Sequence, residues 1–314
     1  MKILHVNALN HRILQDEKKF IADSDNNYEQ RLISIADNIE NSKETKPILL
    51  LAGPSGSGKT TTALKIREIL LERGIITYNI SLDNYFLPKD RFPVDENGKV
   101  DLESPVHVDK ELFTQQLTDL FNGKEVTLPV FNFPDQTRRW GVTLHREKDD
   151  IFIFEGTHAL NPMVIGEVAK YAHKMYVSVR TRLQYDVKGE EDQLLDPAYI
   201  RLMRRIIRDI LFRGRQINRT LDMFDSVEAG EVKYIMPFKN TADYSVDSFI
   251  PYEAPAYKSF VLGKLKAAIA ENKSYERFRP IVQALTEIGA ISLDNIPPDS
   301  LTREFIGGSS YNYD

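Results

Sequence analysis

The stretch Gly53-Pro54-Ser55-Gly56-Ser57-Gly58-Lys59-Thr60 has the spacing G-x-x-x-x-G-K-[ST] of a phosphate-binding P-loop. It follows the apolar run 48–52, which predicts a buried parallel strand, and precedes a helical pattern that ends at Gly74. A glycine-rich turn that matches by coincidence is the structural alternative, but it would not explain both flanks. The sequence therefore predicts a nucleotide-binding site formed by Gly53, Ser55, Gly56, Ser57, Gly58, Lys59, Thr60 and Thr61.

The motif also predicts chemistry at the nucleotide phosphates. Lys59 is expected to reach the β- and γ-phosphates of ATP, and the Thr60 hydroxyl to bind Mg²⁺. A second apolar run, 151–154, ends in Glu155-Gly156. An acid at the end of such a strand orients Mg²⁺ directly or through water in P-loop enzymes, so we expect Glu155 to be the second metal residue. The alternative is a strand-end acid in an ordinary turn. We assign no role to the nearby His158.

The apolar, β-branched run 75–82 predicts a neighbouring strand that ends in Asp83-Asn84-Tyr85-Phe86. Ligands of open α/β sheets bind at the carboxyl ends of the strands. A base for an acceptor hydroxyl has to lie there, and Asp83 is the candidate. The alternative is an aspartate that caps the next turn.

The segment 196–214 predicts a helix that starts at Pro197 and ends at Gly214. Its polar surface carries four arginines, and Asp209 is the main acid available to pair with them. These arginines are Arg201, Arg204, Arg205 and Arg208. A solvated basic face is the simpler interpretation. Because arginine binds phosphate oxygens in a bidentate manner, we favour a lid that closes over phosphates.

The turn signal Asn122-Gly123 and the alternating apolar residues after it predict a β-hairpin that leads into 131–140. This segment holds aromatic, amide and arginine side chains, which suit a flat, polar substrate. A hairpin whose aromatic side chains simply pack inward is an equal alternative.

The composition is that of a globular protein: 314 residues, 42% hydrophobic and 28% charged, with no cysteine. The net charge of -5 and the lack of a long basic block argue against nucleic acid and anionic lipid as partners. The first 20 residues do not resemble a signal peptide, and no apolar run reaches the length of a membrane span. We expect a cytoplasmic protein, and a homo-oligomer is an open alternative.

Taken together, these motifs resemble the uridine kinase and phosphoribulokinase group of P-loop kinases. The resemblance covers residues 47–251 and rests on motifs in a fixed order. They are 53–61, 83–86, Leu102-Glu103-Ser104-Pro105, 129–138, Glu155-Gly156 and 204–215. The C-terminal stretch 303–311 and Tyr252-Glu253 are similar to a bacterial subgroup of this family.

The resemblance implies roles for individual residues. Asp83 would be the base toward a ribose 5′-hydroxyl, with Lys59 and Arg208 as the other catalytic groups. Arg208 and Arg213 would belong to the lid over ATP. The acceptor would be bound by Asp83, Tyr85, Glu103, Phe131, Gln136, Arg138, Arg205 and Arg215. Uridine kinases have tyrosine, aspartate and histidine where this chain has Phe131, Asn132 and Gln136. These three differences weaken the expectation that the acceptor is a pyrimidine nucleoside.

We therefore expect an α/β P-loop NTPase fold: a parallel sheet flanked by helices, with a β-hairpin insertion and a helical C-terminal extension. The expected division is a helical arm and linker (1–46, with a helix over 27–41), a kinase core (47–255) and the extension (256–314). The expected reaction is transfer of the ATP γ-phosphoryl group, with Mg²⁺, to a small-molecule hydroxyl such as a nucleoside 5′-hydroxyl. The alternatives are a kinase of another small alcohol, such as a sugar phosphate or pantothenate, and a non-catalytic nucleotide switch.

Overall fold

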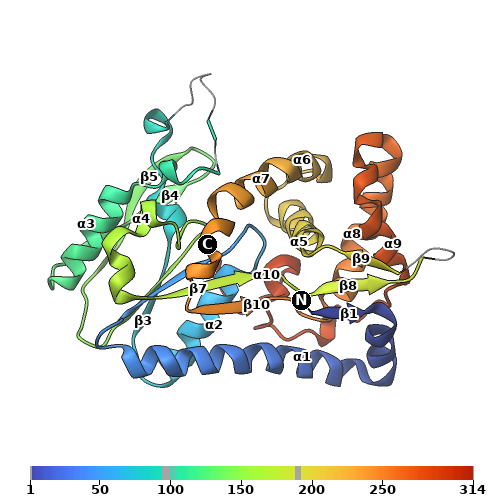
Figure 1. Cartoon of the computed structure of the whole chain (residues 1–314), viewed down its shortest axis with the longest axis horizontal. Coiled ribbons are helices and arrows are strands. Elements are labelled where there is room, and N and C mark those ends of the chain that lie inside the picture. Colours follow the sequence, from blue (N-terminus) through green and yellow to red (C-terminus); the bar gives the residue numbers. More distant parts are fainter. Residues whose placement is uncertain (1, 94–99, 102, 188–191, 314) are drawn as a thin grey trace.

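A five-stranded parallel sheet lies at the centre of the molecule (Figure 1), with the strand order β10-β7-β2-β6-β3. The computed structural model describes residues 2–93, 100–101, 103–187 and 192–313. The strands are β2 (Ile48–Ala52), β3 (Thr77–Ser81), β6 (Ile151–Glu155), β7 (Ala172–Ser178) and β10 (Tyr244–Asp247). β2 is apolar and buried along its whole length, as expected for a strand covered on both faces. The predicted α/β fold is confirmed.

Helices cover both faces of this sheet. Leu49 and Leu51 of β2 belong to a core on one face, whereas Leu50 and Phe154 belong to a core on the other. The first core includes α1 (Val6–Ser42), α2 (Lys59–Glu72), α5 (Pro197–Phe212), α8 (Glu253–Glu271) and α9 (Arg279–Glu287). The second includes α3 (Lys110–Phe121) and α4 (Pro162–Ile165).

Two smaller sheets accompany the central one. A β-hairpin is present, as predicted, and consists of β4 (Val126–Asn132) and β5 (Thr137–Leu144). Its turn lies at 133–136, whereas the Asn122-Gly123 signal on which the prediction relied ends the helix before it. A second sheet joins β1 (Ile3–His5), β8 (Arg182–Tyr185) and β9 (Gln193–Leu195) in the order β1-β8-β9. No pattern in the sequence predicted this sheet, because β1 pairs with a strand about 180 residues away and each of its strands is short.

The N-terminal helix is much longer than predicted. The apolar spacing indicated a helix over 27–41, whereas α1 covers 37 residues and runs along the lower edge of the molecule in Figure 1. Its helical dihedral angles are interrupted at Asp16, whose carboxylate accepts a hydrogen bond from the Lys19 amide at 3.0 Å. This is how an aspartate caps a new helix start. Leu9 and Phe20 of the polar first half are buried in the first core.

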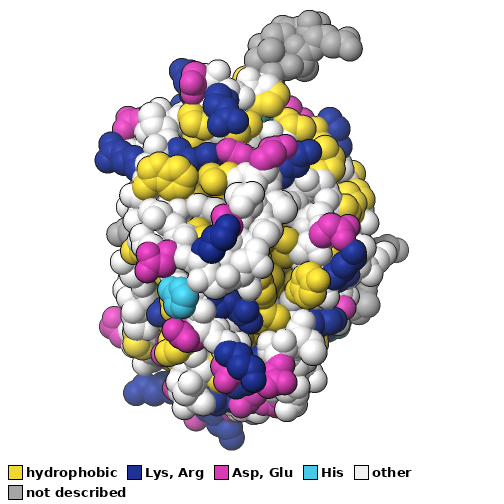
Figure 2. All heavy atoms as spheres, turned by 90° about the vertical axis from the view of Figure 1, so that its left-hand side faces the viewer, with side chains coloured by type: hydrophobic (Ala, Val, Ile, Leu, Met, Phe, Trp, Pro, Cys, Tyr) yellow, Lys and Arg dark blue, Asp and Glu magenta, His cyan; other side chains and the backbone are white. Residues whose placement is uncertain are grey.

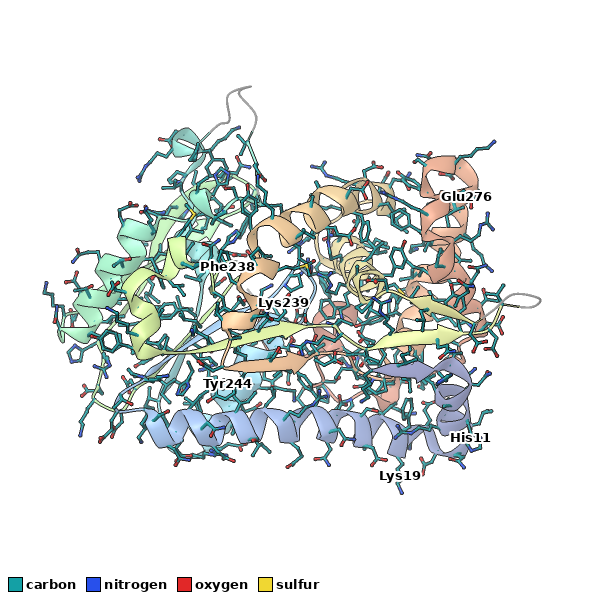
Figure 3. All side chains as sticks on the ribbon, in the orientation of Figure 1. His11, Lys19, Phe238, Lys239, Tyr244 and Glu276 are labelled. Atoms are coloured by element: carbon teal, nitrogen blue, oxygen red, sulfur yellow. The ribbon has the colours of Figure 1, made fainter. Side chains whose placement is uncertain are left out.

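The rest of the chain connects these layers. Between α5 and β10 lie α6 (Ile217–Asp222), α7 (Phe224–Tyr234) and the short η5 (Met236–Thr241). Figure 3 labels Phe238 and Lys239 of η5 above Tyr244, the first residue of β10. Beyond α9, the chain turns back to α10 (Arg303–Ile306), which packs beside α5. Residues 94–99, and Leu102 of the motif 102–105, lie outside the described residues.

The surface in Figure 2 carries interspersed basic and acidic side chains and small apolar groups, so neither sign of charge dominates that face. Among the described residues, no helix is both long enough and apolar enough to cross a membrane.

Candidate active site

The P-loop connects β2 to α2 in the conformation that its glycines allow. Gly56 and Gly58 have φ angles of 74° and 81°, which favour glycine. A side chain at Gly53 would place its Cβ 2.0 Å from the Val177 carbonyl oxygen, so the strand can turn there only without a side chain. The Lys59 ammonium group folds back over the loop and donates to the Pro54 carbonyl oxygen at 3.1 Å.

Two acids lie at the carboxyl ends of strands beside the P-loop. Glu155 ends β6 and is paired in register with Ser81, the last residue of β3, while Asp83 follows in the short η1 (Leu82–Tyr85). The Glu155 carboxylate oxygen lies 3.5 Å from the Thr60 hydroxyl. The sheet therefore brings these two acids together at the carboxyl ends of its strands, beside the P-loop.

Burial shifts the titration of both acids. It raises the pKa of Glu155 to about 7, against the lowering effect of Lys59, and the Asp83 charge adds to the increase. Burial also raises the pKa of Asp83, whereas Lys59, Arg213 and Arg208 lower it. Asp83 thus lies among the cations predicted to hold phosphate, as a group that accepts a proton from an acceptor hydroxyl must.

The predicted lid arginines extend from the second half of α5 into the turn after it. Burial and the neighbouring Arg213 together lower the pKa of Arg208 to about 10, so the group is still charged at neutral pH. Arg213 and Arg215 both approach Asp209, at 3.1 and 3.7 Å. Burial also lowers the pKa of Arg205. One buried carboxylate is shared by several guanidinium groups, which leaves a positive surface suited to phosphate.

Two arginines of α5 are paired, contrary to the expectation of an unpaired basic face. Arg204 is fully buried and forms two hydrogen bonds with Glu253, at 2.7 and 3.1 Å. Arg201 pairs with Glu231 of α7. The prediction was wrong for these two because only acids within the same helix were considered, whereas the partners lie 49 and 30 residues further along the chain.

The hairpin packs against the residues that follow β3. The Phe131 amide donates to the Asn84 side chain at 3.1 Å, and the Phe131 ring packs edge-on against Phe86 and Phe133. Phe131 is 7% exposed and Phe133 is 55% exposed, so one aromatic side chain packs inward and another remains accessible. Gln136 takes the left-handed backbone conformation at the hairpin turn, with φ 51°.

Two residues predicted for acceptor binding, Tyr85 and Arg138, make hydrogen bonds within the protein. The Tyr85 ring lies in the core, 1% exposed, and its hydroxyl donates to Gln116 at 2.8 Å. Arg138 donates to Asp109 at 2.8 Å and to the Phe86 carbonyl oxygen at 2.7 Å, which ties the hairpin to the loop after β3. Tyr85 is the last residue of η1, and its ring packs edge-on against Phe113 in the core, a direction that the strand pattern before it does not predict.

Glu103 and His158 lie together near the candidate base. Burial raises the pKa of Glu103, whereas the charge of Arg205 lowers it. His158 is 4% exposed, interacts with the Glu103 backbone, and has its pKa lowered to about 4 by burial, so its imidazole is neutral at pH 7. The sequence offered one signal for His158, its position three residues after Glu155.

The Thr61 amide and hydroxyl, which the P-loop motif assigns to nucleotide binding, are both hydrogen-bonded to Glu304 of α10. No local pattern in the sequence connects these residues, which are 243 positions apart.

The site offers hard oxygen donors to a cation. The Thr60 hydroxyl and the Glu155 carboxylate are the kind of ligands that Mg²⁺ accepts beside substrate phosphates, so the predicted pair fits this ion. Among the described residues, no cluster of three or more histidines and acids forms an all-protein metal cage. The protein would therefore hold Mg²⁺ with few ligands of its own.

A hollow of about 690 Å³ lies beside the start of α5, and none of the predicted site residues lines it. Its walls include the ion pairs Arg201–Glu231 and Arg182–Asp196, so much of its charge is already compensated.

Comparisons with known proteins match most of the chain to one family. The model of the phosphoribulokinase/uridine kinase family matches residues 48–252. The chain is 32% identical over 197 residues to a uridine kinase of Macrococcus caseolyticus, covering 62% of this chain and 85% of the relative. It is 30% identical over 206 residues to a uridine kinase of Ligilactobacillus salivarius, covering 65% and 86%.

Solved structures show lower similarity. A possible uridine kinase from Bacillus stearothermophilus has a TM-score of 0.46 at 18% identity, covering 69% of this chain and 98% of that one. A putative fructose transport system kinase from Silicibacter has a TM-score of 0.48 at 16% identity, covering 68% and 98%.

Proposed function

Because the chain belongs to the phosphoribulokinase/uridine kinase family, we propose that it transfers the γ-phosphoryl group of ATP to the 5′-hydroxyl of a nucleoside. Membership makes the chain a P-loop kinase that uses an alcohol as acceptor. The nucleoside is the finer step, and the relatives named uridine kinases support it. The observation that carries the proposal is the position of Asp83, which interacts with Lys59 and with two arginines at the end of α5.

In this proposal the chain acts mainly by positioning and by neutralising charge. Lys59, Arg208 and Arg213 hold the phosphates, and their charges favour the transition state, in which negative charge spreads over the transferred group. Asp83 accepts the proton of the acceptor hydroxyl or orients it. Burial favours the protonated form of Asp83 and the three cations favour the ionised form, so the carboxylate is held ready near the phosphates.

Mg²⁺ would neutralise part of the triphosphate charge, and Thr60 and Glu155 would hold it. Burial raises the pKa of Glu155 to about 7, so a cation at this position would replace the proton that burial otherwise favours.

The hairpin is the proposed wall of the acceptor site. Phe131 can pack against a base but cannot donate the hydrogen bond of a tyrosine, and Gln136 cannot carry the charge of a histidine. We propose a relaxed choice among nucleosides, or a preference other than uridine and cytidine, because sites with fewer hydrogen-bonding groups discriminate less. A sugar phosphate or a pantothenate-like alcohol is the alternative acceptor.

The test is a panel of acceptors in a coupled assay of ADP release. The panel contains uridine, cytidine, adenosine, guanosine, inosine and thymidine, together with sugar phosphates and pantothenate, and a reaction lacking acceptor gives the background. ADP release should rise strongly with at least one nucleoside. ADP release only with sugar phosphates or pantothenate would show that the acceptor is another alcohol and not a nucleoside. ADP release independent of every acceptor would favour a nucleotide switch.

A further inference from the structure

The end of the chain, residues 299–313, lies across the start of the P-loop helix; we call it the C-terminal tail. Asp299 pairs with Lys65 of α2 at 2.8 Å, and the Tyr311 hydroxyl donates to Glu68. Leu301 lies so close to Gly58 that a Cβ there would be 2.8 Å from the leucine. The tail is therefore packed against the nucleotide site itself.

Glu304 makes the central contact of the tail. Its carboxylate accepts a hydrogen bond from the Thr61 amide at 3.3 Å and from the Thr61 hydroxyl at 2.5 Å. The Tyr313 hydroxyl lies 3.1 Å from the same threonine oxygen. A carboxylate thus occupies hydrogen-bond donors in the first turn of a P-loop helix.

Those donors are the ones that a nucleotide needs. Thr61 is the third residue of α2, so its amide has no acceptor within the helix. In P-loop proteins the amides of the loop and of this first turn bind the phosphates. The Glu304 carboxylate resembles a phosphate in charge and in its acceptor oxygens, and both groups cannot use the Thr61 amide at once.

The charge of Glu304 also shifts the pKa values of other residues in the site. It raises the pKa of Glu155, the proposed metal residue, and it also raises that of Arg208 in the lid. Its negative charge therefore acts on the groups that a triphosphate and Mg²⁺ would contact.

We propose that Glu304 is an internal competitor of the nucleotide, and that a nucleoside triphosphate displaces it and moves the C-terminal tail off α2. This inference rests on the proposed use of ATP at the P-loop. The Glu304 contacts are lost when ATP binds. The apparent dissociation constant for ATP therefore exceeds the constant of a protein without these contacts, because only the fraction of molecules with a free Thr61 amide can bind.

Calorimetric titration with Mg²⁺ and a non-hydrolysable ATP analogue tests this competition without any acceptor. Glu304→Gln keeps the shape of the side chain and removes its charge, and it should bind the analogue about five- to tenfold more tightly than the wild type. Glu287→Gln is the matched control, because Glu287 is exposed at the end of α9 and takes no part in the contacts described above between the tail and α2. Its affinity for the analogue should equal that of the wild type.

The wild-type protein supplies an independent readout by hydrogen exchange. The Gly307 and Ser310 amides are bonded to the Arg303 and Pro298 carbonyl oxygens, and these amides should exchange faster once the analogue is bound. Equal or weaker binding by Glu304→Gln, or unchanged exchange in the tail of an analogue-bound wild type, would overturn this inference alone. If neither protein binds the analogue, the proposed function fails and the inference fails with it.

Discussion

Replacing Arg204 by methionine should destabilise the whole fold, because this residue joins three separate parts of the chain. Its guanidinium group donates to Glu253 of α8, to the Gly56 carbonyl oxygen in the P-loop at 3.0 Å, and to the Ser248 carbonyl oxygen at 2.7 Å. The side chains of both Arg204 and Glu253 are fully buried. Arg204→Met preserves most of the volume but leaves a buried carboxylate without its cation.

The expected loss follows from this burial. Breaking a buried pair by removing one partner typically costs about 3–5 kcal/mol, since the remaining charge stays desolvated. Burial already raises the pKa of Glu253 while Arg204 holds it down, so the carboxylate in Arg204→Met should take up a proton. Adding Glu253→Gln should restore about 1–2 kcal/mol, because the amide carries no charge and can still accept from the Ile250 amide.

The assay is urea denaturation followed by circular dichroism, with the two single variants and the double variant forming a cycle. Arg279→Met is the surface control: Arg279 also forms two hydrogen bonds to a glutamate, Glu276, but both side chains are about half exposed. The control should lose far less stability than Arg204→Met, because exposed ion pairs contribute little to stability. A loss below about 1 kcal/mol for Arg204→Met, or no gain from adding Glu253→Gln, would refute the reasoning.

Three further changes test other parts of the account. Lys59→Ala should lower turnover in the ADP-release assay by about a thousandfold or more, and near-normal turnover would contradict the P-loop assignment. Burial raises the pKa of Asp25 to about 6 in the folded protein, so folding favours its protonated form, and stability should fall as the pH rises from about 4 to about 6. Asp25→Asn should remove that fall and add about 2–3 kcal/mol at pH 7.5, whereas parallel melting curves against pH for the two proteins would argue against it. Gln136→Ala should change relative kcat/KM among nucleosides more than it changes use of ATP; identical nucleoside ratios would exclude Gln136 from the acceptor site.

Local patterns predicted the centre of the site. The P-loop, the strand before it and the helix after it are contiguous in sequence, and so is each acid with the strand that it ends. Strand order then brings Asp83 and Glu155 together, because β3 and β6 are neighbours in a parallel sheet. The alternating apolar residues correctly predicted the first strand of the hairpin. The Asn122-Gly123 signal did not predict its turn, because these two residues end α3 and the hairpin turns at 133–136.

Contacts between distant segments were not predictable in this way. The sequence placed Arg204 on the polar surface of its helix, whereas in the structure it is buried and paired with Glu253 of α8. The pairing of β1 with β8 and the contact of Glu304 with Thr61 join residues about 180 and 243 positions apart. A single sequence records which side chains a helix carries, but not which distant segment will pack against each face.

The most direct test of the proposed function is to follow the γ-phosphoryl group itself. ATP labelled in the γ-phosphate is incubated with Mg²⁺ and the best nucleoside of the panel, using the wild type and Asp83→Asn, and the labelled product is identified by mass spectrometry. The wild type should place the label on the 5′-oxygen of the nucleoside, and Asp83→Asn should do so about a hundred- to ten-thousandfold more slowly with little change in ATP affinity. Label that appears only in inorganic phosphate with every nucleoside, or equal rates for the two proteins, would contradict the account.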